Sequence, residues 1–318
     1  LYDVAHPVIF IGEVGVGKSS LVAVAAKLML SEQAPKDKSK LKSQSLLTIG
    51  AGRTTVCEVH VRARKSGLDE GELGLEIDAL NAQEMQQVID LWAEDEWRRR
   101  QPGTRTSEDL PTPQEVARAL RAMAGYAESV ESYKDGEVTR RRTIQPLDAV
   151  VPNYASPSDL AIHLSERINL PSRTRRNWWW GDTSTSAMAA LKEKVEAINL
   201  GSEPSATLPQ CMTLVMPAPL ADVAPELGLD LSLVDTRGLE VGVGLFGRAD
   251  LQAFVADPRA ILVLCAPFKA APGDAIRSFL LALSGDARWR SALSRTLLVL
   301  LDHADADQVN GANADRLF

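Results

Sequence analysis

The sequence reads Gly12-Glu13-Val14-Gly15-Val16-Gly17-Lys18-Ser19 near its start, and the expected fold follows from these eight residues. It fits the pattern G-x-x-x-x-G-K-[ST], the phosphate-binding P-loop. The apolar run 7–11 before it predicts a strand, and the mostly apolar run 19–30 after it predicts a helix. Glycines let the backbone N–H groups turn inward, and the helix N-terminus adds the positive end of its dipole. The nine residues from Gly12 to Ser20 are therefore predicted to bind the phosphates of a nucleoside triphosphate.

A second nucleotide motif is expected, because Mg²⁺ in such a site is also held by an acid that ends a neighbouring apolar strand. The best candidate is an apolar run that ends in Asp235-Thr236-Arg237-Gly238, a D-x-x-G pattern. Lys18 is predicted to reach the β- and γ-phosphates, and the Ser19 hydroxyl to bind Mg²⁺. Asp235 is predicted to contact Mg²⁺ through water, and the Gly238 N–H to face the γ-phosphate. The structural alternative is an acidic strand end that caps a turn.

Apolar runs alternate with helix-like segments along the rest of the chain. Strands are predicted at 56–63, 72–79, 229–235, 259–268 and 296–301, and helices at 248–256 and 272–283. Continuous apolar strands separated by helices indicate parallel strands that are covered on both faces. The predicted class is α/β: the three-layer fold of P-loop NTPases, with a mostly parallel sheet, helices on both faces and a mainly helical insertion. The strands 56–63 and 72–79 are expected to pair directly as a hairpin through the polar turn 65–71.

Residues 1–80 and 207–318 are expected to form the nucleotide-binding domain, incomplete at its C-terminal end, and residues 81–206 a helical insertion subdomain. Helices are predicted to begin at Asn81, which forms a capping box with Glu84, at Pro113 as the first helical residue, and at Ser156. A fourth helix is predicted over about 185–200.

The insertion carries arginine runs at 98–100, 140–142 and 173–176, and the last run precedes three tryptophans at 178–180. One interpretation is stacking on nucleobases or anchoring at a partner or membrane interface. We favour solvated helix ends and a tryptophan cluster that packs the insertion onto the core, because acidic residues interleave with the basic ones.

Taken together, the motifs resemble those of P-loop GTPases of the translation-factor-related class, and they are most similar to the septin, dynamin-like and immunity-related groups. The loop GEVGVGKSS is similar to the septin form GESGLGKST, and Asp235 to Gly238 matches the D-x-x-G of that class. The resemblance implies GTP and Mg²⁺ as ligands, and a base-recognition motif at Asp302-His303-Ala304-Asp305. Asp305 would accept hydrogen bonds from guanine N1–H and N2–H₂. His303 stands where the family's base-recognition motif has a lysine, and Asp302 differs from the motif at its first position. ATP therefore stays an alternative ligand, and an acidic turn without a role in binding stays an alternative for Asp302 to Asp305.

The resemblance also implies a switch threonine just before the second strand. Thr54 and Thr55 meet this expectation, since either would complete the Mg²⁺ shell when the γ-phosphate is present. Arg53 is a candidate for neutralising transition-state charge. Threonines also open many strands, so a structural interpretation stays open. Leu239 stands where many small GTPases carry the glutamine that positions water, so hydrolysis is expected to be slow or completed by another group or subunit.

Composition sets the frame for these motifs. The 318 residues carry a net charge of −7, which argues against a protein whose whole surface binds nucleic acid. Cys57, Cys211 and Cys265 lie far apart, and we expect buried free thiols in a reducing compartment. No apolar run approaches the ~20 residues that a membrane-spanning helix needs, so a cytoplasmic location is expected. The chain begins with Leu1 rather than Met, and we expect it to be a piece of a longer protein.

The sequence therefore predicts a Mg²⁺-dependent domain that binds GTP, hydrolyses it slowly, and acts as a switch or assembly domain. Its expected partner is a protein or a second copy of the chain, bound through the switch segments and the helical insertion; nucleic acid is possible but not favoured. One alternative is an ATPase module of a multidomain machine, for instance in nucleic-acid-directed defence or repair. Another is a nucleotide-binding scaffold with little hydrolysis. Lys18, Ser19 and Asp235 would serve equally in each.

Overall fold

The computed structural model describes residues 5–26, 28, 46–47, 56–65, 69–100, 112–135, 138–217, 230–239 and 248–301. The chain divides into two compact units. The first comprises residues 1–76, 178–193 and 211–318, and the second comprises residues 77–177 and 194–210. The boundaries differ from the expected insertion 81–206, because residues 178–193 belong with the first unit.

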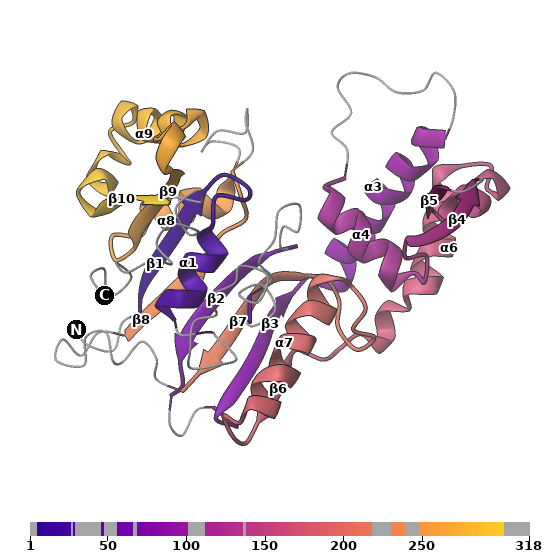
Figure 1. The fold of residues 1–318 in the computed structure, drawn as a ribbon, viewed down its shortest axis with the longest axis horizontal. Helices are drawn as coiled ribbons and strands as arrows, with labels where there is room; N and C mark the ends of the chain where they lie inside the picture. The colour runs from indigo at the N-terminus through magenta and orange to yellow at the C-terminus, as the bar shows by residue number, and fades with distance from the viewer. Residues whose placement is uncertain are drawn as a thin grey trace. The chain divides into compact units, whose positions relative to one another are not determined.

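Within the described residues, the large sheet has eight strands in the order β10-β9-β1-β8-β2-β7-β3-β6 (Figure 1). The strands are β1 (Ala5–Gly12), β2 (Glu58–Ala63), β3 (Leu73–Ala79), β6 (Asn177–Trp180), β7 (Pro209–Met216), β8 (Asp230–Asp235), β9 (Ile261–Pro267) and β10 (Thr296–Leu301). The helices that accompany it are α1 (Lys18–Ala25), α7 (Thr185–Asn199), α8 (Ala249–Ala256) and α9 (Asp274–Gly285), with the 3₁₀ turns η5 (Phe268–Ala270) and η6 (Arg290–Arg295).

Four neighbouring strands of this sheet run in the same direction. β1 pairs in parallel with β8 on one side and β9 on the other, and β9 pairs in parallel with β10. The register places Phe10 opposite Asp235 and Gly12 opposite Cys265, so the carboxyl ends of these strands meet at one edge. β2 is antiparallel to β8 and parallel to β7. The predicted α/β class with a large, mostly parallel sheet is confirmed.

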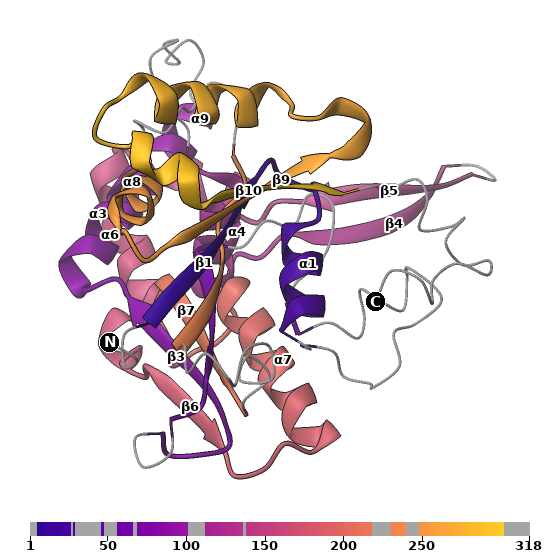
Figure 2. The same cartoon turned by 90° about the vertical axis from the view of Figure 1, so that its left-hand side faces the viewer.

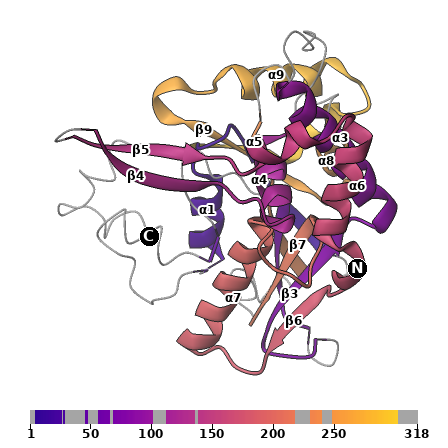
Figure 3. The ribbon, with the colours of Figure 1, turned by 90° about the vertical axis from the view of Figure 1, so that its right-hand side faces the viewer.

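Helices cover both faces of the central strands. Side chains alternate between the faces of a strand, and Ile9 and Ile11 of β1 point to the same face. There they form a buried core with residues of α8 and α9, including Leu251, Val255 and Phe279. Figures 2 and 3 show α1 on the opposite side of β1 from α8. The P-loop motif therefore joins the central strand of the parallel group to a helix that packs on one face of the sheet.

The expected hairpin between β2 and β3 is wrong. β7 lies between these two strands in the sheet and pairs with β2, with Glu58 opposite Cys211 and Ala63 opposite Met216. The end of β7 is the apolar run Leu214, Val215 and Met216, and all three side chains are buried. Burying this run on both faces favours an interior position in the sheet. Sequence reasoning missed β7, although its run of apolar residues was the available signal.

The second unit is built from α3 (Ala82–Arg100), α4 (Gln114–Met123), α5 (Leu147–Val150), α6 (Pro157–Ile168) and the hairpin of β4 (Ser129–Asp135) and β5 (Val138–Ile144), with the 3₁₀ turns η1 (Val151–Asn153) and η2 (Leu170–Ser172). The β4–β5 hairpin, visible in Figure 3, was not predicted. Its signal was Asp135-Gly136 between two runs that alternate in polarity, because Asp-Gly is a common hairpin turn. The register pairs Asp135 with Val138.

The predicted helix starts agree with the structure in most respects. Asn81 and Glu84 exchange side-chain to backbone hydrogen bonds of 2.8 and 2.9 Å, which is a capping box. The Ser156 side chain accepts a hydrogen bond from the N–H of Asp159 at 3.2 Å and caps α6. Pro113 is the N-cap of α4 rather than its first helical residue, as its extended backbone (ψ 137°) shows. Among the helices of the described residues, none is both long and apolar enough to cross a bilayer.

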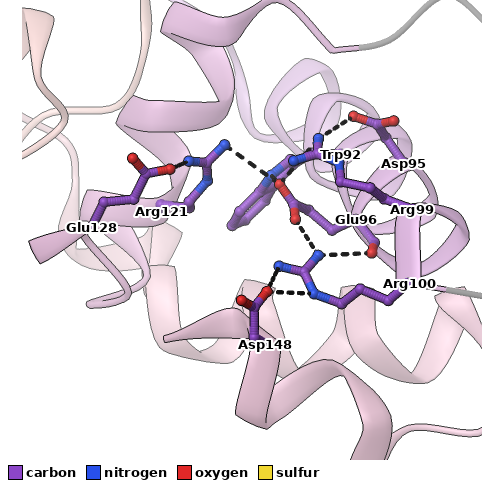
Figure 4. A network of polar contacts seen from close by, with 8 residues as sticks. All are labelled: Trp92, Asp95, Glu96, Arg99, Arg100, Arg121, Glu128 and Asp148. Carbon is purple, nitrogen blue, oxygen red and sulfur yellow. Dashed lines mark hydrogen bonds and ion pairs between the residues drawn. The ribbon is translucent and has the colours of Figure 1, made fainter. Parts of the chain in front are cut away.

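A buried carboxylate organises the charges of the second unit (Figure 4). Glu96 is 1% exposed, accepts hydrogen bonds from Trp92 and Arg100, and forms ion pairs with Arg100 and Arg121. Arg100 also pairs with Asp148 of α5 at 2.6 Å. These contacts join α3, α4 and α5 around one carboxylate, which stays satisfied because several donors converge on it.

The arginine runs of the insertion have different roles. Arg98 and Arg99 form ion pairs with acids one turn earlier in α3, as expected for a solvated helix end. Arg173 is instead buried and donates to the backbone carbonyls of Ile168, Met123, Glu203 and Ala206. The side chains of Arg140 and Arg141 lie outside the described residues. The three tryptophans form most of β6, an edge strand of the large sheet.

Candidate functional site

The Gly12–Ser19 loop carries the G-x-x-x-x-G-K-[ST] motif. It leaves the carboxyl end of β1 and enters α1. Gly15 and Gly17 adopt positive φ angles of 79° and 107°, a region that favours glycine. Gly17 is the N-cap of α1, and the helix begins at Lys18. The N–H of Val16 donates to the carbonyl of Glu13 at 3.4 Å, which closes the turn. The loop thus has a strand before it, a helix after it, and glycine at the two positions of unusual backbone conformation.

Lys18 lies inside this loop. Its side chain is nearly buried, at 6% exposure, and its Nζ donates to the carbonyls of Gly12 at 2.9 Å and Glu13 at 3.0 Å. Burial lowers the pKa of Lys18, and the nearby Asp235 carboxylate acts in the opposite direction. The amine is therefore placed at the mouth of the loop by its own backbone, where an anion would be the natural counter-charge.

Ser19 and Asp235 meet although 216 positions separate them in the sequence. The Ser19 hydroxyl donates to Oδ2 of Asp235 at 2.5 Å. Asp235 is the last residue of β8, and the parallel register of β8 with β1 brings it to the edge where the Gly12–Ser19 loop begins. The strand order thus creates this contact, because β8 lies directly beside β1.

The D-x-x-G segment continues alongside the loop after β8 ends. Thr236 donates from its hydroxyl to the carbonyl of Phe10 at 2.7 Å, and the N–H of Leu239 donates to the carbonyl of Gly12 at 2.8 Å. At Gly238, an added Cβ would lie 2.4 Å from Cγ2 and 2.9 Å from the backbone N of Val14. Glycine is thus required there by the close approach of the two segments. Leu239 is buried in the core with α8 and α9.

Asp235 has the electrostatic character of an incomplete cation site. It is 2% exposed, and its Oδ1 has no hydrogen-bond partner among the described residues. Burial raises the pKa of Asp235 to about 6, although the Ser19 hydroxyl and the Lys18 charge both lower it. Burying an unpaired carboxylate oxygen is costly unless a cation or donor satisfies it.

These residues fit Mg²⁺ in the manner that this ion usually binds. Mg²⁺ keeps several waters and is held by one or two protein oxygens together with substrate phosphates. The Ser19 hydroxyl and the unpartnered oxygen of Asp235 supply that pair of oxygens. Within the described part of the chain, no three His, Cys, Asp or Glu side chains gather as an all-protein metal cage.

Three residues near the site were not singled out from the sequence: Arg248, Asp250 and Glu58. Arg248 precedes α8, and its Nη1 lies 3.5 Å from the carbonyl oxygen of Gly238. Its Nε donates to Asp250 at 2.8 Å. Burial raises the pKa of Glu58, and the neighbouring Asp250 carboxylate raises it further. An Arg-x-Asp pair at a helix start is common, so only its position beside Gly238 makes it noteworthy.

Several predicted site residues fall outside the described residues: Arg53, Thr54 and Thr55, and the whole of Asp302 to Asp305, including His303. Ser20 is the third residue of α1, directly after Ser19. β10 ends at Leu301, at the same edge as the Gly12–Ser19 loop, immediately before the segment that carries Asp305.

Searches of the chain against protein-family models and against curated protein sequences found no match.

Proposed function

We propose that the chain is a Mg²⁺-dependent nucleoside-triphosphate-binding domain of the P-loop NTPase type, with GTP favoured over ATP. The observation that carries the proposal is the contact of the Ser19 hydroxyl with Asp235, because it joins the two motifs that would hold Mg²⁺. The resemblance of these motifs to septin-like and dynamin-like GTPases supports GTP. The nucleotide's phosphates would lie against the backbone of the Gly12–Ser19 loop and the N-terminus of α1.

Each residue then has a distinct chemical role. Lys18 would exchange its contacts with the carbonyls of Gly12 and Glu13 for the β- and γ-phosphates. Ser19 and Asp235 would hold Mg²⁺, which neutralises charge on the phosphates when bound. The Gly238 N–H would face the γ-phosphate, beside Val14 of the loop. The proposed switch residues Thr54 and Thr55 would complete the Mg²⁺ shell in the triphosphate form.

Slow hydrolysis follows from Leu239. This residue is 6% exposed and packs into the core, and leucine has no polar atom that could orient a water. The proposed activity is therefore that of a slow switch, or of an assembly in which another subunit supplies the missing group. The same observation favours a second candidate, a nucleotide-bound scaffold with little hydrolysis.

We expect the substitution Lys18→Ala to lower the affinity for Mg²⁺·GTP by about 100-fold. A charged contact to the phosphates contributes several kcal/mol in a nearly buried site. Equilibrium titration with fluorescent GTP and ATP measures the affinity and ranks the two bases. The fold should survive, since burial of the Lys18 ammonium lowers its pKa and is itself unfavourable.

Lys192→Ala, on α7, is the matched control and should leave nucleotide affinity unchanged. A folded Lys18→Ala protein with wild-type affinity would contradict the role of the Gly12–Ser19 loop. Tighter binding of ATP than GTP would instead favour the ATPase alternative. Single-turnover hydrolysis of bound nucleotide separates a slow enzyme from a scaffold.

A further inference from the structure

Arg248 places a second positive charge at the rim of the Gly12–Ser19 loop. It is the N-cap of α8, and its side chain is only 12% exposed. Its Nη1 lies 3.5 Å from the carbonyl oxygen of Gly238. Leu239, the residue after Gly238, donates its N–H to the carbonyl of Gly12 at 2.8 Å, and the Lys18 ammonium donates to the same carbonyl at 2.9 Å. The segment beside Arg248 and the Lys18 ammonium therefore meet at one carbonyl of the loop.

The guanidinium is held in this position by Asp250. Nε of Arg248 donates to both carboxylate oxygens, at 2.8 and 3.1 Å, and Nη2 donates to Oδ2. Burial by itself raises the pKa of Asp250, but the hydrogen bonds with Arg248 and Glu58 outweigh it and lower this pKa to about 2. Asp250 therefore stays ionised and fixes one edge of the guanidinium. Nη1, at the other edge, is the nitrogen that lies next to Gly238.

The contacts continue without a gap from Arg248 to the loop. Gly238 lies against Val14, since an added Cβ there would be 2.4 Å from Cγ2 of Val14. Lys18 and Arg248 repel each other, and an anion at the rim would relieve that repulsion and gain two charged contacts. Asp250 holds the Nε edge of the guanidinium, so a phosphate would meet the Nη1 side of the planar fork, which can donate charge-assisted hydrogen bonds.

We propose that Arg248 is a second cationic contact for the terminal phosphate of the bound nucleoside triphosphate, positioned beside Gly238 by Asp250. This proposal rests on the proposed function of the Gly12–Ser19 loop. It assigns to Arg248 a preference for triphosphate over diphosphate, because only the triphosphate extends to the D-x-x-G side of the site. It also explains why a hydrogen-bonded Arg–Asp pair occurs at the start of α8, next to the carbonyl of Gly238.

A purely structural Arg–Asp pair is the competing explanation, and the chain offers a matched comparison for it. Arg259 pairs with Asp257 at 2.8 Å through both Nε and Nη2, with the same two-residue spacing. This pair lies just before β9, at the amino end of the strand and so at the opposite edge of the sheet from the loop. Arg259→Gln removes a similar pair without approaching the site.

The test is the ratio of the affinities for a non-hydrolysable GTP analogue and for GDP, both with Mg²⁺, in wild type, Arg248→Gln, Arg248→Lys and Arg259→Gln. We expect Arg248→Gln to weaken the triphosphate about tenfold and the diphosphate less than about threefold. Arg248→Lys keeps the charge but loses the fork, so its ratio should be intermediate. Arg259→Gln should keep the wild-type ratio.

The double variant Arg248→Gln/Asp250→Asn removes both charges, so it tests the proposal even if Arg248→Gln alone folds poorly. An unchanged ratio in folded Arg248 variants would overturn the proposal while wild-type nucleotide binding keeps the proposed function. An equal loss for both nucleotides would assign Arg248 a structural role. Absence of nucleotide binding by the wild type would overturn both proposals.

Discussion

At the scale of single residues, the buried carboxylate of Asp235 is an unfavourable group in the first unit. Within the part of the chain that the structure describes, its Oδ1 is buried without a hydrogen-bond partner, and burial raises the pKa of Asp235 to about 6 against the effects of Ser19 and Lys18. A buried, unpaired carboxylate lowers the free energy of unfolding, and this cost is offset only when a cation binds beside it. Stability and proposed function therefore oppose each other at this residue.

Asp235→Asn should raise the free energy of unfolding of the nucleotide-free protein in EDTA at pH 7, by about 1–3 kcal/mol. Asparagine can still accept from the Ser19 hydroxyl, and it removes a buried charge. Urea denaturation measures the effect. The matched variant Asp257→Asn changes a carboxylate that is paired with Arg259 near the surface, and should shift stability by no more than about 1 kcal/mol. A destabilised Asp235→Asn protein would show that the carboxylate is better satisfied than its contacts indicate.

At the scale of elements, β6 depends on a missing side chain in β3. An added Cβ at Gly74 would lie 2.2 Å from Cζ3 and 2.6 Å from Cε3 of Trp179. The indole ring of Trp179 thus covers the backbone of β3 at Gly74. Close packing leaves no room for one more carbon at such a position. The tryptophans therefore belong to the edge strand of the sheet, whereas the sequence favoured a packing cluster between the insertion and the core without predicting a strand.

Gly74→Ala should lower the free energy of unfolding by about 1–3 kcal/mol, because the methyl group overlaps the Trp179 ring. Gly181→Ala is its control: Gly181 directly follows β6, and an added Cβ there meets nothing within 4 Å. The control should stay within about 0.5 kcal/mol of wild type. Tryptophan fluorescence during urea denaturation reports on both. Equal stability of the two variants would mean that β6 shifts to accept the methyl group.

Elements were the most predictable level of this structure. β1, β2, β3, β8, β9 and β10 lie within a few residues of the predicted strands, because each is a continuous or alternating apolar run. β6 and the β4–β5 hairpin were missed, since the tryptophans were interpreted as a packing cluster and the arginine runs as solvated helix ends rather than as strands. The predicted pairing of β2 with β3 was wrong, because strand pairing depends on long-range burial of apolar surface. The strongly apolar β7 occupies the position between β2 and β3.

At the scale of the whole molecule, stability should depend on pH through His60. Burial lowers the pKa of His60, but hydrogen bonds with Cys211 and Glu58 outweigh it and raise this pKa to about 9. An unfolded histidine titrates near 6.5, so the folded state binds more protons between these values. The contribution is complete below about pH 6.5 and is lost as the pH rises through about 9. Cys57, whose pKa burial raises well above its usual value, acts only at higher pH.

We expect the free energy of unfolding to fall by about 1–3 kcal/mol between pH 6.5 and 9 in the wild type. His60→Gln should flatten this slope, and denaturation at several pH values measures it. His163→Gln is the control, since His163 is a histidine of the second unit whose Nε2 pairs with the Tyr126 hydroxyl. A slope that is the same in wild type and His60→Gln would assign the pH dependence to other groups.

The α/β class, the phosphate-loop motif at Gly12 to Ser19 and the acid at the end of a second strand could all be predicted from the sequence. These features are local, because strand periodicity, glycine content and helix caps act over a few residues. Only the tertiary structure decided the strand order, and with it the contact between Ser19 and Asp235, 216 positions apart. It alone placed Arg248 beside Gly238, since long-range packing carries no short-range signature in the chain.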